Sequence, residues 1–114
     1  MSSEQLNSLV ERHCDTIGDM FTEFQDLYLD RQAGAPPSPE AMGVLHKLKG
    51  SSGSIGFTRV NKAVTTFEKL LKEWPDVEES GQQYDATLNR VLETLKEIID
   101  RTTPEDSTLY GRAL

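Results

Sequence analysis

The sequence lacks several features that would mark out other classes of protein. Its 114 residues include one cysteine, Cys14, so no disulfide can form within the chain. No run of about 18 apolar residues is present, which argues against a transmembrane helix. The first residues, MSSEQLNSLVERHC, are acidic and polar where a signal peptide needs a basic patch and then an apolar stretch. We therefore expect a cytoplasmic protein with no membrane association.

Positive charge is also scarce. Lysine and arginine number 12 against 19 aspartates and glutamates, which gives a formal net charge of −7. A nucleic-acid-binding protein needs a basic face to displace counterions from phosphates, so this balance argues against that class. The length suits a single domain over residues 1–114. We expect a helical bundle over about residues 3–102 and a polar, frayed C-terminal tail over 103–114.

No useful stretch alternates between apolar and polar residues with a period of two, so no β-sheet is predicted. Instead, apolar residues recur at steps of three and four in four segments, the period of amphipathic helices. Proline and glycine separate these segments at Ala33–Pro39, at Gly56, at Trp74–Pro75 and at Glu79–Gly81. The first helix is expected from about Ser3 to Arg31, and the second begins at Ser38 and Pro39, a good N-cap followed by proline. Four such helices with short connections predict an all-α, up-down antiparallel four-helix bundle.

His46 lies on the second predicted helix, opposite its apolar stripe on a helical wheel, so the imidazole is expected to face water. The residues within about 60° of it on the wheel are Met42, Gly43, Lys49, Gly50 and Gly53. Each glycine inside a helix costs about 1 kcal/mol relative to alanine, so three on one face need a reason other than stability. One reason is that they leave the imidazole open to another protein's active site. The alternative is that Gly50 or Gly53 ends the helix.

The segment from His46 to Gly56, HKLKGSSGSIG, closely resembles the signature of the histidine phosphotransfer (HPt) domain family. That signature has the form His-x-Leu-Lys-Gly-Ser, then a small residue and, a few positions later, a glycine. The resemblance covers about residues 40–72. It implies a single HPt domain, a four-helix bundle with a phosphorylatable histidine exposed on its second helix.

The resemblance also implies a role for particular residues. His46 would accept and donate the phosphoryl group through the ring nitrogen distal to the chain, and Lys49 would stabilise the phosphoryl charge. Gly50 would keep the space beside the imidazole clear. Glu68, on the third helix, matches a position where family members often carry Gln or Glu to hydrogen-bond the other ring nitrogen. A carboxylate there would set the tautomer and raise the nucleophilicity of the ring. The alternative for Glu68 is an ordinary solvated charge.

The partners implied by the resemblance are receiver domains of a hybrid sensor kinase and of a response regulator. The receiver would supply the acceptor aspartate and Mg²⁺, so we expect no bound cofactor in this chain. No nucleotide-binding glycine loop is present, which predicts a phosphoryl carrier without kinase activity of its own. The residues expected to contact a receiver are Met42, Gly43, Lys47, Gly50, Gly53 and Phe57, with part of the first helix. Met20 and Leu27 of that helix are expected in the core.

His13 and Cys14 are the other pair that suggests chemistry. Adjacent helical positions point about 100° apart, so they do not form a metal site, and we assign no metal. Two further hypotheses stay open: a non-catalytic adaptor that binds a receiver or kinase without carrying phosphate, and a module of a larger hybrid kinase. His46 with Lys49 favours the relay, and Met1 with the C-terminal tail favours a complete small protein. No dimer signature is present, and we expect a monomer.

Overall fold

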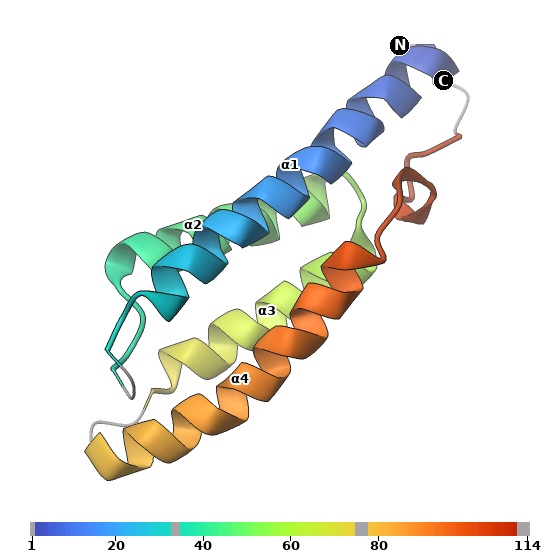
Figure 1. Cartoon of the computed structure of the whole chain (residues 1–114). Helices are drawn as coiled ribbons and strands as arrows, with labels where there is room; N and C mark the ends of the chain where they lie inside the picture. The colour runs from blue at the N-terminus through green and yellow to red at the C-terminus, as the bar shows by residue number, and fades with distance from the viewer. Residues whose placement is uncertain (1, 33–34, 75–77, 112–114) are drawn as a thin grey trace.

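The computed structural model describes residues 2–32, 35–74 and 78–111, and for residues 78–82 it describes the backbone alone. Four α-helices make up most of this part, and a short 3₁₀ helix follows them. Their bounds are α1 Ser3–Leu29, α2 Pro39–Ser54, α3 Thr58–Lys72, α4 Glu78–Asp100 and η1 Pro104–Asp106. The described residues contain no strand. Successive helices run in opposite directions in an elongated bundle (Figure 1). The prediction of an up-down four-helix bundle is confirmed.

The first two helices begin as their sequences predict. At the start of α1, Ser2 and Gln5 form a reciprocal capping box: the Gln5 amide donates to Ser2 Oγ at 3.2 Å, and the Ser2 amide donates to Gln5 Oε1 at 2.9 Å. At the start of α2, the Ala41 amide donates to Ser38 Oγ at 3.1 Å. These bonds satisfy amides that have no partner within their own helix.

Two predicted boundaries are wrong. The first helix ends at Leu29 instead of about Arg31, and the predicted loop at Glu79–Gly81 lies inside α4, which begins at Glu78. A single glycine costs a helix only about 1 kcal/mol, so one glycine near a helix start does not end it when the following turns pack against the bundle.

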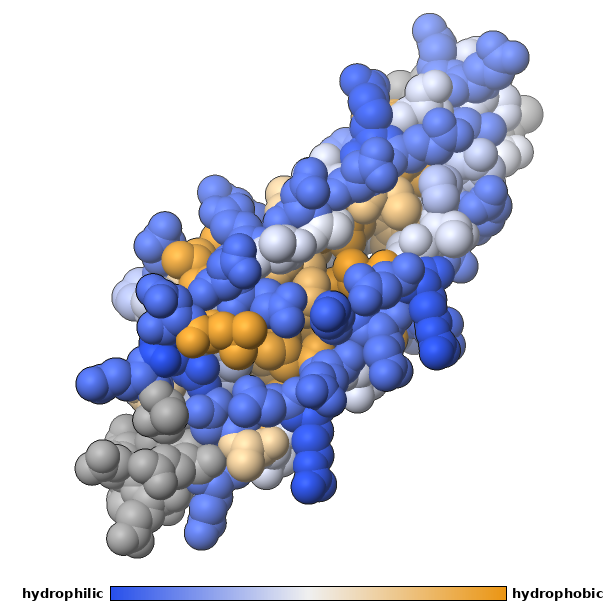
Figure 2. Space-filling model, in the orientation of Figure 1, coloured by the Kyte–Doolittle hydropathy of each residue, from blue (hydrophilic) through white to orange (hydrophobic). Residues whose placement is uncertain are grey.

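The apolar stripes of the helices meet in one core. Phe24 and Tyr28 of α1 stack with their ring centroids 5.6 Å apart, and Phe67 of α3 meets Phe24 edge-on at 5.9 Å. The Tyr28 hydroxyl donates to Asp85 of α4 at 3.3 Å, and Arg31 pairs with the same carboxylate. Burial raises the pKa of Tyr28 above its usual range. Figure 2 shows that the outer surface on this face is largely hydrophilic, with hydrophobic side chains visible in the seam between α1 and α4.

The segment after α4 is not frayed over residues 103–111, so that prediction is wrong for this part; residues 112–114 lie outside the described residues. Ser107 is buried, and its hydroxyl donates to the Ile55 carbonyl. The Thr108 amide donates to the Gly56 carbonyl at 3.0 Å, and the Gly111 amide donates to Asn7 Oδ1 at 2.7 Å. The segment therefore ties the α2–α3 turn to the start of α1.

Gly56 occupies this turn for two physical reasons. Its φ of +81° is rarely adopted by residues with a Cβ, and a Cβ there would lie 2.2 Å from Thr108 Oγ1. Gly18, in the middle of α1, is different, because a Cβ there would meet nothing within 4 Å.

Replacing these two glycines should change stability in opposite directions. Gly56→Ala should lower the free energy of unfolding by at least about 1 kcal/mol, because the backbone is strained and the docked segment must shift. Gly18→Ala should raise it by up to about 1 kcal/mol, since alanine is the better helix former. Urea unfolding of the two variants checks this, and a shift of the same sign in both would contradict it.

Candidate functional site

His46 stands on the solvent side of α2. Its side chain is 74% exposed, whereas Leu45 and Leu48 on the opposite side are fully buried. The wheel geometry therefore places the imidazole as expected. Because α2 continues to Ser54, neither Gly50 nor Gly53 ends the helix, and that alternative is wrong.

Glu68 of α3 lies directly behind the imidazole. Its side chain is only 5% exposed, and its Oε2 is 3.2 Å from Nδ1 of His46. Burial of this kind rules out the alternative of a solvated surface charge. An ionised carboxylate only accepts hydrogen bonds, so the neutral ring carries its proton on Nδ1 and donates it to Glu68. The lone pair then lies on Nε2, the nitrogen distal to the chain.

Two lysines reach the same carboxylate. Lys49 Nζ is 3.4 Å from Glu68 Oε1, and Lys72 Nζ, one turn further along α3, is 3.7 Å from it. Burial by itself would raise the pKa of Glu68, but the hydrogen bond with His46 and the charges of Lys72 and Lys49 outweigh it and hold the pKa below its usual value. Glu68 is therefore ionised at neutral pH. Lys72 was not predicted as part of the site, although its i+4 spacing from Glu68 indicates that the two side chains can pair on one face of a helix.

A hydrogen bond from Asn61 to the Lys49 carbonyl joins α3 to α2 near the site. The Lys49 carbonyl accepts from Ser52 Oγ at 3.0 Å and from Asn61 Nδ2 of α3 at 2.9 Å. A Cβ at Gly53 would lie 3.0 Å from that same Asn61 nitrogen. Gly53 therefore has a packing reason to be glycine, namely the close approach of α3.

The remaining glycines near His46 have no such reason. A Cβ at Gly43 or Gly50 would meet nothing within 4 Å, and both residues are exposed. Their lack of a side chain is not required by packing within this chain. Because these glycines have no side chain, the surface beside His46 is unobstructed.

The other predicted contact residues divide into two groups. Lys47 is exposed and Met42 is half-buried against the core. Phe57 is 1% exposed, so its inclusion in an exposed surface is wrong. It follows the Gly56 turn, and its ring enters the core instead of continuing the exposed face of α2. Met20 and Leu27 are half-buried and pack against the core, as expected.

His13 and Cys14 do not form a second reactive site. Cys14 is half-buried, and its thiol lies 3.7 Å from the Thr102 carbonyl. Burial raises the pKa of this thiol, which disfavours the reactive thiolate. Within residues 2–32, 35–74 and 78–111, no group of three His, Cys, Asp or Glu side chains is placed to hold a metal ion. Every helix in the described part of the chain is too short or too polar to cross a membrane.

Together these features define a helical bundle with one exposed histidine, which a buried carboxylate orients and two exposed glycines flank. Comparison with known families identifies it further: the Hpt domain family matches residues 8–102. The chain belongs to the Hpt family, whose members carry phosphoryl groups in phosphorelays and interact with receiver domains. No curated protein and no solved structure matched the chain significantly.

The low pKa of Glu68 predicts a pH-dependent contribution to stability. A carboxyl group whose pKa is lower in the folded state stabilises the fold above its unfolded-state pKa, and this contribution is lost as the pH falls through the folded-state pKa. Glu68→Gln should therefore destabilise the protein more at about pH 7 than at about pH 3. Urea unfolding at both pH values measures the difference. Glu93→Gln, an exposed carboxylate of α4, is the control; an equal loss at both pH values for Glu68→Gln would refute the prediction.

Proposed function

We propose that the chain relays a phosphoryl group from a receiver-domain aspartate of a hybrid sensor kinase to that of a response regulator, through phosphohistidine at His46. The contact of 3.2 Å between His46 Nδ1 and Glu68 Oε2 is the observation that carries this proposal. It turns Nε2, with its lone pair, toward the exposed side of the ring. Membership of the Hpt family supports the same reaction class.

No proton needs to leave the site during phosphoryl transfer. Nε2 of His46 attacks the phosphorus of the aspartyl phosphate, and a P–N bond forms as the P–O bond to the aspartate breaks. The electron pair of that bond returns to the aspartate as carboxylate. The ring, still protonated on Nδ1, becomes positively charged, and the Glu68 carboxylate beside Nδ1 stabilises that charge. The reverse step delivers the phosphoryl group to a second aspartate.

Lys49 supplies a positive charge for the phosphoryl group on Nε2. Its ammonium group contacts Glu68 and remains partly exposed, and it stands one turn along α2 from His46. A phosphoryl group on Nε2 brings oxygens within its reach, and charge-assisted hydrogen bonds to them lower the energy of the phosphorylated state. Lys72 keeps Glu68 paired when Lys49 turns outward. In this proposal the receiver domain supplies Mg²⁺ and the aspartate. The chain itself holds no cofactor and does not transfer a phosphoryl group from ATP.

Phosphotransfer from a phosphorylated receiver domain tests the function. Wild type should acquire an acid-labile, base-stable label, and His46→Gln should acquire none, because Nε2 is the nucleophile. If neither protein takes label while the receiver binds tightly to both, the relay is refuted and the adaptor hypothesis is favoured.

Side chains added at Gly50 should block the receiver without harming the fold. A Cβ at this position meets nothing within 4 Å, so Gly50→Ala should be at least as stable as wild type in urea. Gly50→Gln places a long side chain beside the imidazole and should slow transfer by about tenfold or more, which corresponds to about 1.4 kcal/mol in the activation free energy. The transfer rate of Gly50→Ala should lie between those of Gly50→Gln and wild type. Equal transfer rates for all three proteins would show that the receiver does not approach over Gly50.

A further inference from the structure

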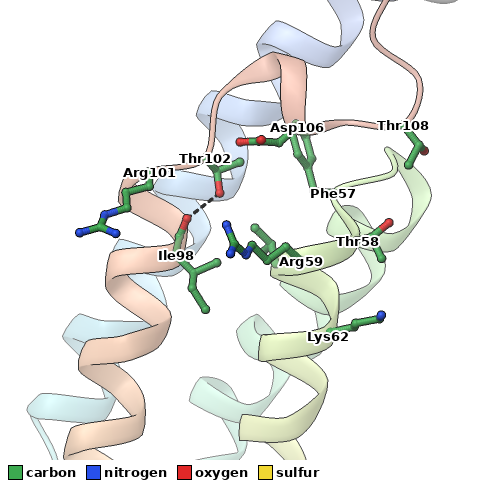
Figure 3. Close-up of a pocket in the computed structure, with 10 residues that line it drawn as sticks. Phe57, Thr58, Arg59, Lys62, Ile98, Arg101, Thr102, Asp106 and Thr108 are labelled. Atoms are coloured by element: carbon green, nitrogen blue, oxygen red, sulfur yellow. Dashed lines mark hydrogen bonds between the residues drawn. The ribbon is translucent and has the colours of Figure 1, made fainter.

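A pocket lies away from His46, between the start of α3 and the end of α4 (Figure 3). Its volume is about 390 Å³, within the range of small-molecule sites. Its lining residues are Phe57, Thr58, Arg59, Val60, Lys62, Ile98, Arg101, Thr102, Asp106 and Thr108. Arg59 precedes Glu68 by nine positions, about 14 Å along the axis of α3. The pocket is therefore separate from the phosphorylation site.

Cationic side chains predominate around this pocket. Arg59, Lys62 and Arg101 line it and are exposed, and none of them forms an ion pair with any residue of the described ranges. Asp106 is the one acidic residue of the lining, and its carboxylate accepts a hydrogen bond from the Thr103 amide at 2.8 Å. Three positive charges and one negative charge leave a formal excess of two positive charges. Such an excess is unusual on a chain whose net charge is −7.

The geometry separates a polar part of the pocket from an apolar one. In Figure 3 the guanidinium of Arg59 extends into the space between α3 and α4, toward Ile98 and Thr102, while the charged ends of Lys62 and Arg101 point away from that space. The apolar part of the lining that a ligand can reach comes mainly from Ile98, which is half-buried, because Phe57 and Val60 are each only 1% exposed. A ligand with an anionic group and an apolar group would match both parts.

We propose that this pocket binds a small organic phosphate. The phosphate would lie against the Arg59 guanidinium, whose fork of N–H donors matches phosphate oxygens, with Lys62 and Arg101 turning inward to it. Once Lys62 and Arg101 have turned inward, the lining carries an excess of two positive charges, which matches a phosphate monoester with close to two negative charges at neutral pH. The organic part would cover the half-buried side chain of Ile98. This site is independent of phosphotransfer at His46, because it shares no residue with it.

Titration of the full, ¹⁵N-labelled chain with phenyl phosphate tests the proposal by NMR. Phenyl phosphate combines a phosphate monoester with an apolar ring. Saturable shifts are expected for the amides of residues 57–62 and 98–102, with an apparent Kd at least tenfold lower than for inorganic phosphate. Arg59→Gln should raise the Kd for phenyl phosphate at least tenfold. Arg90→Gln, an exposed cation of α4 outside the pocket, is the matched control and should leave the Kd unchanged.

Several results would overturn the proposal. Shifts that do not saturate, or that centre on His46 and Lys49, would place no site in this pocket. An unchanged Kd in Arg59→Gln, whose circular dichroism confirms the fold, would show that the guanidinium does not hold the phosphate. Equal affinity for inorganic phosphate and phenyl phosphate would rule out a contribution from the apolar lining and with it an organic ligand.

Discussion

The buried carboxylate of Glu68 is the constraint on which the functional site depends. A charge that is 5% exposed has lost most of its hydration, and such a charge is tolerated only when hydrogen bonds and opposite charges compensate. Here His46, Lys49 and Lys72 all approach the two carboxylate oxygens. Two of these three come from α2, so the carboxylate also fixes how α2 and α3 lie side by side. The contact with Nδ1 also orients the His46 ring, so that Nε2 is directed away from Glu68.

Glycine serves two different purposes around this site. At Gly56 the fold requires it, since φ is positive and a Cβ would lie 2.2 Å from Thr108 Oγ1, and at Gly53 the packing favours it, since a Cβ would lie 3.0 Å from Asn61 Nδ2. At Gly43 and Gly50 nothing in the chain fills the space that a side chain would occupy. Glycine lowers helix stability at these two positions, and no packing within the chain compensates for that cost. This is expected where a partner's surface packs against the helix instead.

The fold and the centre of the site could be predicted from the sequence. Three other predictions were wrong, all for the same reason. Glu79–Gly81 looked like a loop, Phe57 looked like part of an exposed face, and residues 103–111 looked frayed. Each of these depends on what packs against the segment. The turn at Gly56 redirects the chain and carries Phe57 inward, and Ser107 then bonds to the carbonyl of Ile55, 52 positions earlier. No local pattern contains such a partner.

The sequence by itself determined the four helices and the exposure of His46. Both follow from the 3.6-residue period, because helix geometry places each residue at a set angle from the apolar stripe that must be buried. Only the tertiary structure decided that Glu68 is buried behind the imidazole, that Lys72 joins it, and that Arg59 and Arg101 line one pocket. These groups lie up to 42 positions apart in the chain, from Arg59 to Arg101, and their meeting depends on how whole helices pack.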